Sequence, residues 1–155
     1  IPSSVKRVAV MLHPSNEEWQ KVRQTFSPDV LQTDAEDFAA LDIPDDVECW
    51  PVHREPNTVT DTFRMSIRVS GTYLYEGAKS GQGEAVDWSA AANLARNGNM
   101  ILAGGLGPEN VGEAIATAKP FGVDVSSGVE SAPGEKDSQK IRAFIKAAKA
   151  AENNL

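Results

Sequence analysis

The sequence of 155 residues contains a single cysteine, Cys49, and only two histidines, His13 and His53. One cysteine excludes an internal disulfide and suits a reducing compartment, so we expect a cytoplasmic protein. Neither the isolated histidines nor Cys49 shows the spacing of metal ligands, and we therefore expect no metal site. No apolar run approaches the roughly 20 residues that span a bilayer. The first residues also lack the pattern of a signal peptide.

Positive charge is scarce as well. The chain has 15 Lys and Arg against 22 Asp and Glu, a formal net charge of −7. Because nucleic acids and anionic membranes bind clusters of basic residues, we expect neither as a partner. A small anionic ligand remains compatible, since backbone N–H groups can bind it without net positive charge. The length and the ordinary share of hydrophobic residues predict one globular domain over residues 1–155.

The chain does contain a regular alternation of strand-like and helix-like segments. Strands are expected at residues 5–12, 29–33, 47–53, 72–75, 99–103 and 122–125. Helical segments are expected at residues 15–26, 34–41, 59–64, 88–96, 108–118 and from Asp137 onward. Ser15 and Glu18 form a capping box, and Ser89 is a candidate cap. Such alternation predicts right-handed crossovers and a parallel sheet.

Two architectures contain units of this kind. One is an open doubly wound sheet, and the other is a (β/α)₈ barrel, which typically needs about 250 residues. Length alone favours the open sheet. In both architectures the ligand binds at the carboxyl ends of the strands, so the residues at those ends are the candidate site residues.

Two neighbouring strand ends carry glycine and serine. Gly104 and Gly105 follow the fifth expected strand, and Ser126 and Ser127 follow the sixth, ahead of Gly128. Adjacent glycines let the backbone approach a ligand, and consecutive free N–H groups can bind an anion. The pattern therefore predicts a phosphate site. The alternative is a pair of tight turns that merely require glycine.

Acidic residues stand at two other strand ends. Glu76 and Asp34 could each act as a general acid or base, or could be ordinary helix caps or solvated charges. The glycine-rich segment 79–84 could be a mobile lid or a plain connector. Cys49 lies within an apolar strand and is expected to be inert core. No Gly-x-Ser-x-Gly elbow and no phosphate-binding P-loop motif are present.

Several segments together resemble one enzyme family. Residues 101–111, residues 122–130 and the pair Lys136-Asp137 resemble the carboxyl-terminal part of phosphoribosylanthranilate isomerase. Residues 81–88, from Gly81-Gln-Gly83 to Asp87-Trp88, resemble that family's glycine-rich loop. Residues 30–37 and 8–15 resemble the ends of its fourth and third strands more weakly.

The resemblance implies a (β/α)₈ barrel and sets aside the argument from length. It covers the family's third to eighth units, with six strands running parallel in chain order. The family's catalytic base is a cysteine in a Lys-x-Cys-Gly motif of strand one. The sequence contains no such motif, and Cys49 lies on a different strand. We therefore expect these 155 residues to be inactive by themselves.

The resemblance also implies a reaction and a set of site residues. The family converts N-(5′-phosphoribosyl)anthranilate by an Amadori rearrangement in tryptophan biosynthesis, with no cofactor. Glu76 stands where the family has its general acid, an Asp, and Asp34 stands where the family has a His, with a role left open. The remaining positions are implied to bind the phosphate (Gly104, Gly105 and Ser126, beside Ser127) or the rest of the substrate (Asp124, Gly81 and Gly83).

Two alternatives remain at this point. One is a phosphoribosyl isomerase of histidine biosynthesis, although those barrels carry phosphate sites in both halves. The other is a barrel remnant that binds a phosphate ester without turnover, an interpretation favoured by the departures at Glu76 and Asp34. The expected partner is a small phosphorylated substrate, and the expected state is a monomer or homodimer.

Overall fold

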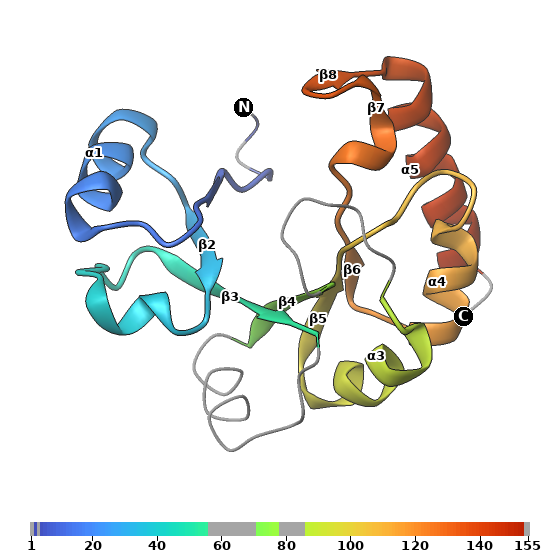
Figure 1. Cartoon of the computed structure of the whole chain (residues 1–155), viewed down its shortest axis with the longest axis horizontal. Helices are drawn as coiled ribbons and strands as arrows, with labels where there is room; N and C mark the ends of the chain where they lie inside the picture. The colour runs from blue at the N-terminus through green and yellow to red at the C-terminus, as the bar shows by residue number, and fades with distance from the viewer. Residues whose placement is uncertain (1, 3, 56–70, 78–85, 154–155) are drawn as a thin grey trace.

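A computed structural model describes residues 2, 4–55, 71–77 and 86–153 (Figure 1). Six strands form one sheet in the order of the sequence, and every neighbouring pair is parallel. The strands are β1 (Val8–Val10), β2 (Val30–Asp34), β3 (Glu48–Arg54), β4 (Thr72–Glu76), β5 (Asn99–Leu102) and β6 (Gly122–Val123). The predicted parallel order is therefore confirmed. The open doubly wound sheet is wrong, because its strand order reverses at a switch point.

The helices run along this sheet in the expected places, with shorter bounds. They are α1 (Asn16–Phe26), α3 (Trp88–Leu94), α4 (Val111–Ala118) and α5 (Ser138–Glu152), with 3-10 turns η1 (Asp37–Ala40), η2 (Ala95–Asn97) and η3 (Ser127–Val129). α1 lies beside one end of the row of strands, and α3, α4 and α5 lie beside the other (Figure 1). The helix expected at 34–41 is only the short turn η1. The one expected at 59–64 lies outside the described residues.

Capping explains where the helices begin. Ser15 and Glu18 form the predicted capping box of α1. Asp137 caps α5 by accepting hydrogen bonds from the N–H groups of Gln139 and Lys140. At α3 the prediction of Ser89 as the cap is wrong. The cap is Asp87, whose carboxylate accepts from the N–H groups of Ser89 (2.9 Å) and Ala90 (3.2 Å). Asp87 directly precedes the first helical residue, Trp88, and from this N-cap position its carboxylate reaches both donors.

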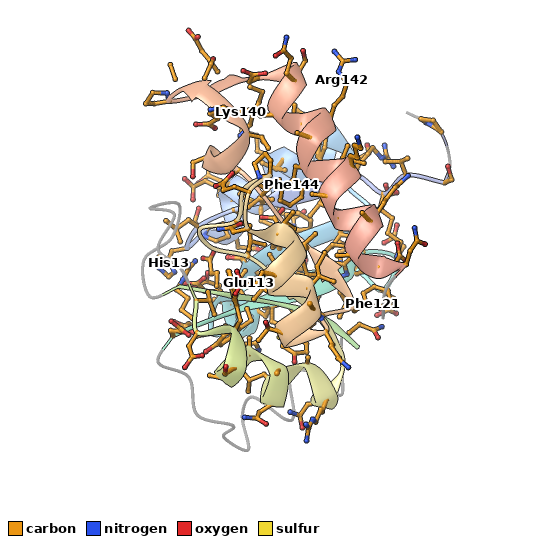
Figure 2. All side chains as sticks on the ribbon, turned by 90° about the vertical axis from the view of Figure 1, so that its right-hand side faces the viewer. His13, Glu113, Phe121, Lys140, Arg142 and Phe144 are labelled. Carbon is orange, nitrogen blue, oxygen red and sulfur yellow. The ribbon has the colours of Figure 1, made fainter. Side chains whose placement is uncertain are left out.

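The core has one large part and two small ones. The large cluster lies between β4, β5 and the helices α3 to α5 and includes Tyr73, Met100, Leu102 and Phe144. Figure 2 shows Phe144 on the side of α5 that faces the rest of the molecule, whereas Arg142 points away. A smaller cluster surrounds the fully buried Trp19 of α1. Phe26, at helical spacing from Trp19 on the same apolar face, is nevertheless 44% exposed.

One element is not expected from the sequence. β7 (Glu130–Ala132) and β8 (Glu135–Lys136) form a small antiparallel hairpin between η3 and α5, apart from the main sheet. Its turn contains Gly134 at φ 81°. Strands this short give no periodic signal that sequence inspection could detect. Within the part of the chain that the structure describes, no helix is long and apolar enough to cross a bilayer.

Candidate active site at the carboxyl edge of the sheet

Three charged residues end three successive strands. Asp34 ends β2, Arg54 ends β3 and Glu76 ends β4. The register places Arg54 directly opposite Glu76. The Arg54 guanidinium forms an ion pair with the Glu76 carboxylate through Nη1. Its other edge bonds Asp34, with Nη2 to Oδ1 at 2.7 Å and Nε to Oδ2 at 3.3 Å. The sheet therefore joins the two predicted acidic residues through an arginine.

His13 extends this cluster to the end of β1. Its backbone adopts the left-handed region at φ 46°, which is uncommon for a residue with a side chain. The ring lies 3.1 Å from Asp37 through Nδ1 and 3.6 Å from Asp34 through Nε2. The hydrogen bond to Asp37 and that carboxylate's charge raise the pKa of His13. We call His13, Asp34, Asp37, Arg54 and Glu76 the edge network.

All side chains of the edge network except His13 are largely buried. Asp34 is 9% exposed, Asp37 14%, Glu76 18% and Arg54 20%, whereas His13 is 60% exposed. Buried charges require partners, because the loss of hydration is otherwise uncompensated. Each member of the network meets this requirement through another member. The edge network is therefore a mutually paired and mostly buried cluster of charges at the carboxyl edge, rather than a set of solvated surface charges.

The loops after β5 and β6 form the second part of this edge. Gly104 and Gly105 have φ values of 91° and 63°, which glycine adopts without strain. The Asn110 side chain holds this loop: Nδ2 donates to the Gly105 carbonyl (2.9 Å), and Oδ1 accepts from the Gly107 N–H (2.8 Å). A Cβ on Gly128 would lie 1.9 Å from the Leu106 carbonyl oxygen. The two loops are therefore packed against each other.

Lys136 faces the loop after β6 from the hairpin. Its Nζ donates to the Ser126 carbonyl (2.9 Å), to Ser126 Oγ (3.2 Å) and to Glu130 Oε1 (2.6 Å). Burial raises the pKa of Asp124, which follows β6, and the Lys136 charge opposes that rise. This lysine supplies a cation where the sequence predicted only N–H groups and hydroxyls.

The structure brings most predicted site residues to one edge. Glu76 and Asp34 meet through Arg54, while the other predicted residues follow β5 (Gly104, Gly105) and β6 (Asp124, Ser126, Ser127). Gly81 and Gly83 lie outside the described residues. Cys49 lies in β3 away from this edge, half-buried, and burial raises the pKa of its thiol. Sequence inspection missed Arg54 and Lys136. For Arg54 the available signal was its position at a strand end, the same signal that selected Glu76.

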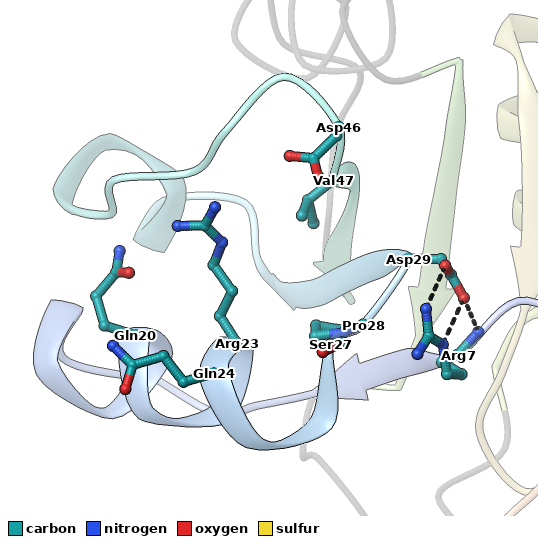
Figure 3. A pocket seen from close by; sticks show the side chains of 9 residues that line it. All are labelled: Arg7, Gln20, Arg23, Gln24, Ser27, Pro28, Asp29, Asp46 and Val47. Carbon is teal, nitrogen blue, oxygen red and sulfur yellow. Dashed lines mark hydrogen bonds and ion pairs between the residues drawn. The ribbon is translucent and has the colours of Figure 1, made fainter.

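A separate cavity of about 490 Å³ lies at the opposite end of the sheet. It is lined by residues that precede β1, β2 and β3, among them Arg7, Asp29 and Val47, and by Arg23 of α1 (Figure 3). Arg7 and Asp29 form a two-pronged ion pair there, with nitrogen–oxygen distances of 2.9 and 3.1 Å. Residues at the amino ends of barrel strands serve stability rather than chemistry. We therefore assign the candidate active site to the carboxyl edge.

Neither part of the carboxyl edge resembles a metal centre. In the residues that the structure covers, no group of three or more His, Cys, Asp or Glu side chains is placed to hold a metal ion. The parallel strands in chain order, with charged groups and glycine loops at their carboxyl ends, define the (β/α)-barrel class of α/β proteins.

Comparison with known proteins identifies the family within this class. The family model for N-(5′-phosphoribosyl)anthranilate (PRA) isomerase matches residues 2–147. The N-(5′-phosphoribosyl)anthranilate isomerase of Listeria monocytogenes serovar 1/2a is 36% identical over 98% of this chain and 77% of its own length. The chain belongs to the N-(5′-phosphoribosyl)anthranilate isomerase family. The relative from Roseiflexus castenholzii is 49% identical over 102 residues, which are 66% of this chain and 43% of the relative's own length, so the chain spans less than half of that relative.

Solved structures agree with this assignment. The isomerase from Thermus thermophilus superposes with a TM-score of 0.79 at 26% identity, covering 97% of this chain and 75% of that one. TrpF from Jonesia denitrificans superposes with a TM-score of 0.72 at 32% identity, covering 98% and 75%. The barrel fold expected from the resemblance is therefore confirmed.

Proposed function

We propose that this chain supplies the general acid and the phosphate site for isomerisation of N-(5′-phosphoribosyl)anthranilate in tryptophan biosynthesis. The observation that carries the proposal is the juxtaposition at the carboxyl edge of Glu76, in the place of the family's acid, with the glycine and serine loops after β5 and β6. Family membership supports the reaction, and the geometry supports the division of roles. Because one cysteine cannot form an internal disulfide, we assign the protein to the reducing cytoplasm. We also propose that it acts as a monomer or homodimer.

The reaction begins with proton donation by Glu76 to the ribose ring oxygen. The bond between that oxygen and C1′ then breaks, and the anthranilate nitrogen supplies the electron pair that forms a C1′–N double bond. A base removes the proton from C2′, which moves the double bond to C1′–C2′ and neutralises the nitrogen. The resulting enol gains a proton at C1′ and releases its hydroxyl proton from O2′, which gives the 2′-ketone of the 1-deoxyribulose product. In the family the base is a cysteine of strand one.

The phosphate end of the substrate is assigned to the other part of the edge. Backbone N–H groups of the loops at Gly104–Gly105 and Ser126–Ser127 are expected to donate to the phosphate oxygens. Asp124 is expected near the ribose hydroxyls. Binding at the phosphate and chemistry at Glu76 then fall on different strands, so each can be removed separately.

The decisive experiment measures isomerase activity in the protein translated from its complete gene. Glu76→Gln keeps the size of the side chain and removes its proton, so the rate is expected to fall about 10²–10⁴-fold with little loss of phosphate affinity. Glu76→Asp restores the family's residue and is expected to remain active. The matched control is Glu113→Gln, on the exposed face of α4 (Figure 2), which is expected to behave like the parent.

Each outcome bears on a separate part of the proposal. Full activity of Glu76→Gln would remove Glu76 from the mechanism and leave the family assignment standing. Binding of inorganic phosphate without any turnover in the complete protein would favour the remnant that only binds a phosphate ester. A bulky residue at Gly105 is expected to weaken phosphate binding, and unchanged binding would move the phosphate site elsewhere.

A further inference from the structure

Arg54 is the only arginine or lysine of the edge network. It stands between two carboxylates on the neighbouring strands, and all three side chains are at least four-fifths buried. Asp34 occupies two of the guanidinium nitrogens, Nε and Nη2. Glu76 receives the third, Nη1. The guanidinium is therefore divided unequally between the two acids.

This division matters because a general acid must carry a proton before it can donate one. A neighbouring arginine favours the ionised form of a carboxyl group, so an arginine bound to Glu76 alone would oppose protonation. The same cation stabilises the carboxylate that appears once the proton has moved to the substrate. An arrangement that meets both requirements holds Glu76 near the guanidinium while a second carboxylate binds the same guanidinium and shares its positive charge. Asp34 is that second carboxylate.

We propose that Arg54 is a positioning residue that holds Glu76 at the end of β4 through Nη1, and that Asp34 anchors the guanidinium and limits its hold on Glu76. The inference rests on the proposed function, in which Glu76 is the proton donor. It also gives Asp34, whose role the resemblance leaves open, a defined task. Asp34 acts through Arg54 and need not touch the substrate.

Other charged groups around Glu76 are already engaged. The Glu55 carboxylate accepts from the Tyr75 hydroxyl (3.4 Å) and the Asp87 N–H (3.1 Å), and the Glu55 N–H donates to the Glu76 carbonyl (3.0 Å). His13 lies 3.6 Å from Asp34 through Nε2 and 3.1 Å from Asp37 through Nδ1. Among the described residues, Arg54 is the cation that contacts Glu76 directly.

The test compares the pH dependence of kcat in two variants that must move it in opposite directions. Arg54→Gln removes the cation, so the alkaline limb is expected to shift to higher pH by about one unit, while kcat falls as Glu76 loses its anchor. Asp34→Asn leaves the guanidinium to Glu76 alone, so the limb is expected to shift to lower pH. In the double variant the shift caused by Asp34→Asn is expected to disappear. Arg54→Lys is expected to restore the limb in part.

A second readout does not depend on turnover. The titration of the Glu76 carboxyl carbon, followed by NMR, is expected to move up in Arg54→Gln and down in Asp34→Asn. Arg7→Gln is the matched control, because it breaks the equivalent ion pair with Asp29 at the amino ends of the strands. It is expected to lower stability without moving the Glu76 titration.

Failure of this inference is distinguishable from failure of the proposed function. If Glu76→Gln is fully active, the acid assignment fails, yet the NMR titration still decides whether Arg54 and Asp34 act on Glu76 as proposed. If Glu76→Gln is impaired but Arg54→Gln and Asp34→Asn shift the limb in the same direction, or not at all, the division of the guanidinium is wrong. Circular dichroism of each variant shows whether it is folded.

Discussion

At the ends of β2 to β4, charged side chains face one another: two acids share one arginine, and a histidine joins them from the end of β1. At the ends of β5 and β6, the same edge is made of glycine and serine loops, where the backbone comes close enough to exclude any side chain at Gly128. The first part consists mainly of charged side chains, and the second consists mainly of closely packed backbone. Substitutions should therefore alter chemistry at one part and shape at the other.

The largest effect is expected from Gly128→Ala. The added methyl group would lie 1.9 Å from the Leu106 carbonyl oxygen, so the backbone of one loop must shift. Overpacking of this kind costs typically 1–3 kcal/mol, and a backbone clash should reach about 3 kcal/mol. Loss of inorganic phosphate binding should accompany it, as measured by calorimetry.

Gly112→Ala provides the matched control. Gly112 lies in α4 with no heavy atom within 4 Å of an added Cβ. Alanine is expected to raise the free energy of unfolding by about 0.5–1 kcal/mol, because glycine is the weaker helix former. If Gly128→Ala and Gly112→Ala lose the same stability, the close packing of the Gly128 backbone against Leu106 is not the reason why glycine is required there.

The second prediction separates the two histidines. Burial lowers the pKa of His53, which is 6% exposed, to about 4. The unfolded chain then binds more protons than the folded one between pH 6.5 and 4, so stability falls as the pH falls through this window. The expected loss is about 2 kcal/mol, and His53→Gln should abolish most of it. Denaturant unfolding at several pH values measures the difference.

His13 should behave in the opposite way. Its raised pKa means that its contribution to stability is complete below pH 6.5 and is lost as the pH rises through the raised value. The ring is exposed, so the slope should be small and should weaken with salt. If His13→Gln and His53→Gln change the pH dependence of unfolding with the same sign, the contrast between edge network and core is wrong.

The smallest effect on ligand binding is expected from Lys136→Met. Removing one cation beside the loop after β6 should weaken inorganic phosphate binding about tenfold, because a charge-assisted hydrogen bond from a half-exposed lysine contributes about 1.5 kcal/mol, the lower end of its usual range. Lys146→Met, on the exposed side of α5, should leave binding unchanged. Because phosphate binding involves no proton at Glu76, neither variant should move the alkaline limb of the pH–rate profile.

Much of the fold followed from local patterns. The strands at β2, β3, β4 and β5 lie within a residue or so of their expected bounds, because buried parallel strands are short apolar runs ended by turn residues. The glycine pair at 104–105 was recognisable because its left-handed backbone favours glycine. The hairpin of β7 and β8 was missed, because strands of two and three residues are too short to show an alternating hydrophobic pattern.

The choice of architecture shows the limit of local patterns. Periodicity alone predicted a parallel sheet, and length then favoured the open form. The observed order of strands excludes that form, and the resemblance to a barrel family had anticipated it. Strand order depends on which side of the sheet each crossover returns to, and the hydrophobic period does not encode that choice.

The sequence by itself determined which residues stand at strand ends, where helices begin and where glycine is required, because these depend on neighbours within a few positions. Only the tertiary structure decided that Arg54 lies opposite Glu76 and also bonds Asp34. Ion pairs between strands depend on the register of the sheet, which is set by the packing of the whole core. The partners of the candidate acid therefore became visible only once the strands lay side by side.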